Sequence, residues 1–432
     1  MAKVPPVKGT RDFYPEQMAV RNWIFDGWRN VSRRNGFVEY DSPIFEYLQL
    51  YTQKSGDEIA GQLFSLTDRG GRELAIRPET TPALARMVNQ KINSLPLPIK
   101  WFSISRLCRA ERPQKGRLRE FFQWNIDIIG SDSEYADADC IYTAVDYLRS
   151  VGLTPSDIVV KISSRSMLAE LLKSQGFAED QFATVYSLLD KRPKLPEDTF
   201  TALAQEQIPD VRLRDKLMQI ASIATIDELI AFAPDSVRDS VEPLKRVFTL
   251  LENMGVADYC TFDINIVRGL AYYTGIVFEI FDRNAQLRAV GGGGRYDNLL
   301  AGMGGQQVAA TGFGMGDVVL EILLQEKNII PPIQIGLDVF VIEAAPNSKT
   351  EAKLLQTVNA LRSKGFTAVF DYRRIALSKQ LKQASTLNAR FALIIGDKTL
   401  DQDRISLKNM TEGSQKEIPF TDFLTQPERY LS

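Results

Sequence analysis

The feature that most constrains the fold is a change of pattern at residues 328–336, NIIPPIQIG. Before this segment, extended apolar stretches follow one another with short polar turns between them, which is typical of an antiparallel sheet. After it, strand-like and helix-like segments alternate, which predicts an α/β domain with a mainly parallel sheet. The adjacent Pro331 and Pro332 favour a linker. Two or three folded units are therefore expected, as the length of 432 residues also suggests.

The first unit is predicted to span residues 1–327. A helix is expected at 17–36, and another after the RPETT segment at 77–81, with Thr80 or Thr81 as its cap. The glycine-rich run GGGGRYDNLL (291–300) predicts a turn that leads into a helix. Strands are expected at 62–68, 72–78, 99–111, 119–130, 159–164, 261–267 and 272–282.

Two further parts of the chain differ from this sheet pattern. Residues from about 165 to 255 read as helical, with breaks at Pro193, Pro196 and Pro209, and so predict a helical insertion. Residues 337–432 form the predicted α/β unit, whose size of about a hundred residues suits an independent domain. Its strands are expected at 337–344, 366–372 and 389–396, and its helices at 350–365 and 378–388.

The chain contains no histidine, which limits the chemistry open to it. Mechanisms that need an imidazole base, and metal sites that need histidine ligands, are excluded. Cys108, Cys140 and Cys260 are too few and too scattered for a disulfide framework or a zinc site, so no protein metal site is expected. An enzyme built from this chain must depend on carboxylates, cations, backbone dipoles and the substrate itself.

The remaining composition points to the cytoplasm and to no membrane partner. No apolar run approaches the roughly 18 residues of a membrane span, and the N-terminus, MAKVPPVKGTRDFYPEQ, has neither a signal-peptide core nor the character of a transit peptide. The net charge of -2 gives no sign of nucleic-acid binding but does not exclude it, because local patches set the field.

The densest cluster of functional side chains is RAERPQKGRLREFFQ, at residues 109–123. Two strand-like segments flank a loop that holds Arg112, Lys115, Arg117 and Arg119, and a cationic hairpin tip suits anionic phosphates. An aromatic side chain beside it, Phe121, suits stacking on a base. On charge alone, a solvated hairpin tip is an equally good interpretation.

Three other segments have both a functional and a structural interpretation. In RPETT (77–81), a Glu and a Thr at a turn would hold an ammonium group, or simply cap a helix. In IVRGLAYYTG (266–275), an Arg and paired tyrosines would line a pocket, or form a strand with aromatic core residues. In the glycine run, the backbone would approach a ligand closely, although the pattern is neither GxGxxG nor a Walker loop.

In this order and spacing, the segments resemble the histidyl-tRNA synthetases, a family of class II aminoacyl-tRNA synthetases. The resemblance extends from Lys8-Gly9-Thr10-Arg11-Asp12 through RPETT, RAERPQKGRLREFFQ (class motif 2), RGLAYYTG and GGGRYD. The segment around Pro43 resembles class motif 1, a dimer element. ERPQKGR and RGLxYYTG are specific to the family. The fold implied is an α+β catalytic domain built on an antiparallel sheet, with a helical insertion and a C-terminal α/β domain similar to the family's anticodon-binding domain.

The activity implied is ATP-dependent ligation of L-histidine to tRNA(His) through a histidyl-adenylate, with release of AMP and diphosphate. ATP with Mg²⁺ would be the cofactor, and a homodimer the assembly. An alternative is a non-catalytic paralogue that acts as regulatory subunit of ATP phosphoribosyltransferase in histidine biosynthesis. Such paralogues typically lack the anticodon domain and lose the arginines matching Arg109 and Arg268, all of which are present here. A histidine-sensing domain of a larger regulator is a third interpretation.

The resemblance also implies roles for individual residues. Arg109 and Arg268 would be catalytic: Arg109 holds the α-phosphate and the substrate carboxylate, and Arg268 stabilises the pentacoordinate phosphorus. The ATP-binding positions would be Arg109, Glu111, Arg117, Phe121 and Arg268. The histidine-binding positions would be Glu79, Thr80, Thr81, Arg109, Gln123, Asp127, Arg268, Tyr272 and Tyr273. The tRNA acceptor loop would include Arg112, Gln114, Lys115 and Arg117.

The chain departs from the family in class motif 3, which normally supplies an Arg that holds ATP. That Arg position is occupied by Val319, and the neighbouring Glu position by Val318. Arg117 and Arg295 are the candidates for a compensating cation. Smaller departures are Ala271, where the family usually has Asp, and Asn298, where Gly is commoner.

Overall fold

The computed structural model describes residues 4–52, 61–269, 272–284, 286–333 and 335–431. It divides into two compact units, one ending at Pro331 and the other beginning at Pro332, with residues 13–19 grouped with the second. This division falls inside the segment 328–336. Within the described ranges, no helix is both long and apolar enough to cross a membrane.

The first unit is built on an eight-stranded sheet with the order β1-β5-β6-β11-β10-β9-β7-β8. Its edge strands, β1 and β8, pair parallel with their neighbours, and every interior pairing is antiparallel. The expected antiparallel sheet is therefore confirmed. The strands are β1 (Val38–Glu39), β5 (Ile99–Cys108), β6 (Glu120–Ile129), β7 (Ile158–Ser164), β8 (Cys260–Phe262), β9 (Ile276–Asp282), β10 (Gly291–Arg295) and β11 (Ala310–Gly316).

Strand β6 shows how the sequence separates core from site. Successive side chains of a strand point to opposite faces, so Trp124 and Ile126 share one face while Gln123, Asn125 and Asp127 share the other. Trp124 is fully buried, and its ring stacks against Trp28 of helix α1 (Pro15–Arg34) with ring centroids 6.0 Å apart. The apolar face thus anchors the strand, and the polar face remains for a ligand.

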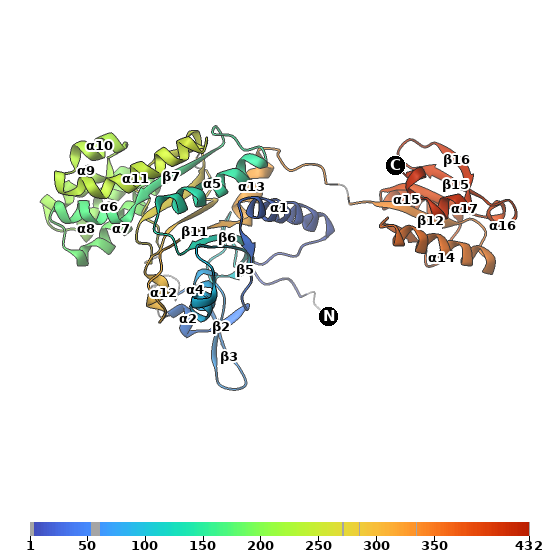
Figure 1. The fold of residues 1–432 in the computed structure, drawn as a ribbon, viewed down its shortest axis with the longest axis horizontal. Coiled ribbons are helices and arrows are strands. Elements are labelled where there is room, and N and C mark those ends of the chain that lie inside the picture. The colour runs from blue at the N-terminus through green and yellow to red at the C-terminus, as the bar shows by residue number, and fades with distance from the viewer. Residues whose placement is uncertain (1–3, 53–60, 270–271, 285, 334, 432) are drawn as a thin grey trace. The chain divides into compact units, whose positions relative to one another are not determined.

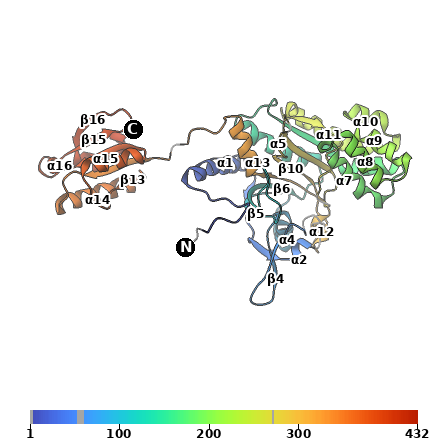
Figure 2. The same ribbon diagram turned by 180° about the vertical axis from the view of Figure 1, so that it is seen from behind.

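Smaller elements extend the first unit. A three-stranded sheet comprises β2 (Phe45–Tyr47), β3 (Phe64–Thr67) and β4 (Glu73–Ile76), and the β3–β4 hairpin projects from the unit (Figure 1). Helices α4 (Thr81–Lys91) and α12 (Leu299–Gly302) lie side by side in both views (Figures 1 and 2). The other helices here are α2 (Gln49–Thr52), α5 (Glu134–Ser150) and α13 (Asp317–Glu326).

The helices expected between about 165 and 255 are present, between β7 and β8. They gather at one end of the first unit, drawn in green to yellow in Figure 1. The last of these helices, α11, packs against α6 of the same cluster and against α5, and its contact with α5 holds the cluster against the rest of the first unit. The cluster contains α6 (Arg165–Ser174), α7 (Phe182–Lys191), α8 (Glu197–Gln207), α9 (Val211–Ala221), α10 (Ile226–Phe232) and α11 (Asp235–Asn253).

The second unit has a five-stranded sheet with the order β13-β12-β14-β15-β16. Strand β12 (Leu337–Glu343) pairs parallel with β13 (Ala368–Phe370) and β14 (Ala389–Ile395), as expected. The sheet continues antiparallel through β15 (Arg404–Asn409) and β16 (Gln415–Pro419), which the sequence analysis missed. The helices are α14 (Ser348–Ser363), α15 (Leu377–Thr386), α16 (Asp397–Asp401), α17 (Phe420–Thr425) and α18 (Glu428–Leu431).

Two local predictions in the first unit are wrong. The glycine run was expected to be a turn but forms β10, between β9 and β11. Neighbouring strands approach so closely there that a Cβ on Gly293 would lie 2.0 Å from the Gly312 carbonyl oxygen, so glycine is the residue that fits. The strand expected at 261–267 ends at Phe262, because the Asp263 carboxylate accepts a hydrogen bond from the Asn265 backbone at 3.0 Å and forms a turn.

Candidate active site

Two adjoining cavities lie against the polar face of β6. The smaller has a volume of about 60 Å³ and the larger about 800 Å³. Four residues belong to the walls of both: Arg109, Gln123, Arg268 and Gly314. The larger volume falls in the range typical of small-molecule sites. The two arginines predicted to be catalytic therefore stand at the boundary between the cavities.

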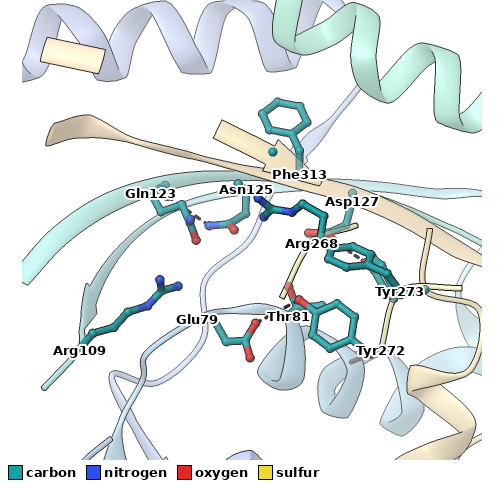
Figure 3. Close-up of a pocket in the computed structure, with 14 residues that line it drawn as sticks. Glu79, Thr81, Arg109, Gln123, Asn125, Asp127, Arg268, Tyr272, Tyr273 and Phe313 are labelled. Carbon is teal, nitrogen blue, oxygen red and sulfur yellow. Dashed lines mark hydrogen bonds between the residues drawn. The ribbon is translucent and has the colours of Figure 1, made fainter. Parts of the chain in front are cut away.

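The small cavity brings together the residues predicted to bind histidine, with one exception. In Figure 3, Gln123, Asn125 and Asp127 reach it from the sheet, while Glu79 and Thr81 reach it from the opposite side. The Tyr272 hydroxyl donates to Glu79 Oε2 at 3.2 Å. The exception is Thr80, which is buried and lines neither cavity. The predicted residues in the wall are Glu79, Thr81, Arg109, Gln123, Asp127, Arg268, Tyr272 and Tyr273.

Asp127 is the most deeply buried acid in this cavity wall. The Tyr296 hydroxyl donates to its Oδ1 at 2.5 Å, whereas no described residue forms a hydrogen bond with its Oδ2. Burial raises the pKa of Asp127 to about 7, even though the Tyr296 hydrogen bond lowers it. A buried polar atom without a protein partner is costly. Oδ2 therefore suits a donor group of a small polar ligand.

The raised pKa of Asp127 predicts how stability depends on pH. Its pKa increases from an ordinary value of 3.8 to about 7 on folding, so between these values the folded chain holds more protons than the unfolded chain. The stability that protonated Asp127 contributes is complete below pH 3.8. It is lost at up to about 1.4 kcal/mol per pH unit as the pH rises toward 7.

The substitution Asp127→Asn removes this titration. Relative to wild type, the variant should gain stability from about pH 5 to pH 7 and then keep a constant difference. Urea denaturation followed by tryptophan fluorescence measures this, since all four tryptophans, Trp23, Trp28, Trp101 and Trp124, lie in the first unit. A difference that stays constant from pH 5 to pH 8 would mean that Asp127 is ionised throughout.

Arg268 is held in an unusual backbone conformation. Its φ of 58° is in the left-handed region, which non-glycine residues rarely occupy and which is often found at functional sites. Its guanidinium pairs with the Glu279 carboxylate and lies 5.9 Å from the centre of the Tyr273 ring. Burial lowers the pKa of Arg268, but Glu279 and Tyr273 raise it more, so the net shift is upward. Arg268 is therefore a fixed cation at the boundary between the cavities.

Glycines make room for the polar side chains of the small cavity. Each of three glycines in its wall lies directly against one predicted site residue. A Cβ would lie 2.8 Å from Arg268 Nη1 if placed on Gly292, 2.3 Å from Asp127 Oδ1 on Gly312, and 2.6 Å from Gln123 Nε2 on Gly314. Real Cβ atoms do not approach other heavy atoms so closely. The polar side chains of the site thus occupy the space that a Cβ would fill if these three positions were not glycine.

The large cavity holds all the residues predicted to bind ATP. Arg109 donates from Nε to the Pro78 carbonyl oxygen at 3.0 Å, and its guanidinium lies 5.1 Å from the centre of the Phe121 ring. Glu111 and Arg117 form an ion pair in the same wall. With Arg268, these complete the predicted set of Arg109, Glu111, Arg117, Phe121 and Arg268.

The predicted tRNA acceptor loop is a tight turn of the hairpin between β5 and β6. Gln114 and Arg117 exchange backbone hydrogen bonds of 2.9 Å in each direction, and Gly116 has a φ of 77°. Arg112, Gln114 and Lys115 are exposed and line neither cavity, and Lys115 pairs with Glu326 at 3.3 Å. The loop therefore directs Arg117 toward the large cavity and its other predicted contacts toward solvent.

The valines in place of class motif 3 lie in the wall of the large cavity. Val318 and Val319 both line it, so this wall carries no charge where the family resemblance implies an arginine. Ala271 lies outside the described residues, and Asn298 lines neither cavity.

The structure contradicts Arg295 as the compensating cation. Arg295 lines neither cavity, pairs with Asp137 at 2.7 Å and Asp297 at 3.3 Å, and donates to the carbonyl oxygens of Ser131 and Ser133 at 3.0 Å each. Its guanidinium is thus committed to structural contacts. Arg117 does line the large cavity.

Several wall residues were not predicted. Asn125 and Tyr296 line the small cavity. Asn125 could have been predicted from the sequence, because it lies between Gln123 and Asp127 on the polar face of β6. Phe313 also borders it, although its ring points away from the other labelled side chains in Figure 3. Asp190 and Lys194, from the helical segment, line the large cavity and had no local signal. Among the described residues, no group of three or more acids or cysteines is placed to hold a metal ion.

Comparisons with known proteins match nearly the whole chain. The family model described as histidyl-tRNA synthetase matches residues 9–317, and the one described as anticodon binding domain matches residues 338–426. The chain is 41% identical to the chloroplastic/mitochondrial histidine–tRNA ligase of Arabidopsis thaliana, over 97% of this chain and 86% of that protein. It is 38% identical to the histidine–tRNA ligase of Opitutus terrae, over 97% of each chain.

A solved structure agrees with these matches. The apo histidyl-tRNA synthetase of S. aureus superposes with a TM-score of 0.75 at 26% identity, covering 100% of both chains. The expected class II fold is thus confirmed, and the regulatory-subunit alternative is not favoured by relatives that are named as ligases. A family model that covers most of the chain and relatives of this similarity lead to one conclusion: the chain belongs to the histidyl-tRNA synthetase family.

Proposed function

We propose that this chain ligates L-histidine to tRNA(His) in two steps, using ATP and releasing diphosphate and then AMP. The observation that carries the proposal is the adjoining pair of cavities, with Arg109 and Arg268 in the walls of both. A small polar cavity suits the amino acid, and a larger cavity with an aromatic ring and several cations suits the nucleotide.

In the small cavity, Glu79, Thr81 and Gln123 would accept hydrogen bonds from the α-ammonium group of histidine, and Tyr272 and Tyr273 would line the space for its imidazole ring. Asp127 Oδ2, which has no hydrogen-bond partner among the described residues, would accept the imidazole N–H. In the large cavity, Phe121 would stack on adenine and Glu111 would accept from its amino group. These positions leave the histidine carboxylate and the α-phosphate to meet at Arg109 and Arg268.

The first step needs no protein base, which suits a chain without histidine. A carboxylate oxygen of the substrate attacks the α-phosphorus, the bond from that phosphorus to the bridging oxygen of the β-phosphate breaks, and diphosphate leaves. Arg109 positions both reacting groups, and Arg268 stabilises the charge that develops on the phosphorus oxygens. In the second step, a ribose hydroxyl of the tRNA attacks the adenylate carbonyl, a phosphate oxygen of the adenylate accepts the proton, and AMP leaves.

We infer that ATP enters with Mg²⁺. This ion usually keeps several water ligands and binds through substrate phosphates and one or two carboxylates. The large cavity fits this requirement, since Glu279 and Asp282 are in its wall and would hold the ion together with the phosphates. When bound, Mg²⁺ neutralises part of the phosphate charge.

The tRNA would contact several parts of the chain. Residues 337–432 would bind the anticodon, as the family match at 338–426 supports. The exposed Arg112, Gln114 and Lys115 would meet the acceptor end beside the active site. We propose residues 1–327 as the catalytic domain, with 165–255 as its insertion and 328–336 as the linker.

We also propose a homodimer in the cytoplasm. Several large apolar side chains are exposed on and beside the segment around Pro43, which resembles class motif 1. Large apolar side chains exposed on neighbouring parts of a surface suit a protein interface. The exposed apolar side chains on and beside β1, β2 and β3 are those of Val38, Ile44, Phe45, Tyr47 and Leu66.

The test of this function is ATP–diphosphate exchange by the purified chain with each of the twenty amino acids. Exchange that depends on histidine alone is the expected result and would establish adenylate formation. Absence of exchange, with histidine binding retained in calorimetry, would overturn the proposal in favour of a non-catalytic role.

A prediction about the tRNA concerns the extra 5′ guanylate of tRNA(His). Removing this nucleotide from a transcript should lower kcat/KM for charging by about 10- to 100-fold, the cost of losing one or two charge-assisted contacts. Steady-state charging of paired transcripts measures it. Histidine-dependent exchange without tRNA serves as the control and should not change. Equal charging of both transcripts would mean that Arg112, Gln114 and Lys115 do not recognise that nucleotide.

A further inference from the structure

We propose that Arg288 binds the β- and γ-phosphates of ATP, and so supplies the cation that Val319 does not. This inference rests on the proposed function, because it assigns a residue to the nucleotide site. Arg288 precedes β10, is exposed and lines the large cavity. It was not among the residues suggested by the sequence.

The pairing of β10 with β11 brings Arg288 and the valines to the same cavity wall. β10 and β11 are antiparallel, with Gly291 opposite Met315. The pairing extends one residue further, since the Gly316 N–H donates to the Val290 carbonyl oxygen at 3.2 Å. Arg288 comes two residues before Val290, and Val318 comes two residues after Gly316, in the first turn of α13. Arg288, Val318 and Val319 all line the large cavity, so Arg288 brings a cation to the wall where the valines supply none.

Arg288 is also distinguished by its lack of competing partners. Among the described cations of the large cavity, it is the one for which no hydrogen bond, ion pair or ring contact to the protein exists. The other cations have protein contacts: Arg109 with Pro78, Arg117 with Glu111, Lys161 with Asp263, Lys194 with Asp190, Arg268 with Glu279, and Arg283 with the Pro155 carbonyl oxygen.

A free guanidinium is well suited to the terminal phosphates. Arg presents paired N–H donors that match phosphate oxygens, and it keeps its charge at all physiological pH values. Cations already paired with carboxylates contribute less net field, because the pair is nearly neutral. The β- and γ-phosphates carry most of the charge of ATP, so an unpaired cation should bind them rather than the adenosine part.

The test compares Arg288→Ala and Arg288→Lys with the matched control Arg283→Ala. Arg283 is in the same loop and borders the same cavity, but its Nε donates to the Pro155 carbonyl oxygen at 2.6 Å. Histidine-dependent exchange gives KM values for ATP, diphosphate and histidine, and inhibition by AMP reports on the adenosine and α-phosphate contacts. Since Arg288 is exposed, its replacement should not affect folding.

For Arg288→Ala we expect KM for ATP and for diphosphate to rise about 10- to 100-fold. The inhibition constant of AMP and KM for histidine should stay within about twofold, because neither ligand has the phosphates in question. Arg288→Lys should recover part of the loss by restoring the charge. Arg283→Ala should change each constant by less than about threefold.

Two outcomes would overturn the inference. One is an unchanged KM for ATP and diphosphate in Arg288→Ala, and the other is an equal weakening of AMP and ATP. If the wild-type chain shows no histidine-dependent exchange, the proposed function fails instead. Calorimetric titration of wild type and Arg288→Ala with ATP and with AMP then still decides whether Arg288 contacts the terminal phosphates.

Discussion

Replacing Arg268 with alanine is expected to lower the rate of adenylate formation by about a thousandfold or more. The guanidinium is a fixed cation at the boundary of the two cavities, where, in the proposed mechanism, negative charge develops as the carboxylate attacks the α-phosphorus. Removing one preorganised donor to such charge typically costs about 10²- to 10³-fold, and removing a catalytic arginine about 10³- to 10⁵-fold. Histidine binding should weaken by less than about tenfold, because the interaction is strongest in the transition state.

The measurement is single-turnover formation of the adenylate, with histidine affinity determined by calorimetry. Arg268→Gly is the matched control, because the φ of 58° is unstrained for glycine. Both variants lack the guanidinium, so both should lose the chemical step, and any difference between them reports on the backbone. A large loss of histidine binding with an unchanged chemical step would contradict the proposed role.

The second large effect concerns stability. Arg295→Ala should lower the free energy of unfolding of the first unit by about 3–5 kcal/mol, as is usual when one partner of a buried ion pair is removed. The side chains of Arg295 and Asp137 are only 8% and 2% exposed. Burial raises the pKa of Asp137 to about 6 even though Arg295 lowers it, so the carboxylate depends on its partner. The carbonyl groups of Ser131 and Ser133 would lose donors as well.

Urea denaturation followed by tryptophan fluorescence measures this loss. The double variant Arg295→Met/Asp137→Asn should recover part of it, because it removes the buried charge left behind by the single change. A loss below about 1 kcal/mol for Arg295→Ala is the size usual for an exposed ion pair. That result would contradict the structural role of the Arg295–Asp137 pair.

The sequence allowed the main fold of each unit to be predicted because side-chain patterns carry that information. Antiparallel strands with apolar alternation and a linker with paired prolines are local signals. The glycine strand β10 gave no such signal, since a run without side chains has no periodicity to read, and its close neighbours come from distant parts of the chain. Strands β15 and β16 were missed because their apolar pattern is weak: Ile405 and Leu407 are the buried residues of β15, and Ile418 is that of β16.

Prediction of the site depended on family resemblance more than on pattern. Taken alone, RPETT and the paired tyrosines read as ordinary structure, and only their order in the chain indicated a pocket. Asn125 was recoverable from alternation along β6, whereas Arg288 was not, because its place at the cavity wall that holds Val318 depends on the pairing of β10 with β11. Arg295 was misjudged because sequence does not show that Asp137 is there to bind it.

The glycines of the small cavity have a genetic consequence. Gly292, Gly312 and Gly314 each leave the space that a neighbouring polar side chain occupies. Every glycine codon begins with two guanines, so any missense change in either base adds a Cβ to one of these strands. Such a mutation would impair the enzyme without touching a reactive group. The mutational target of this active site therefore includes codons whose product contributes no side chain at all, and a search for inactivating variants should include them.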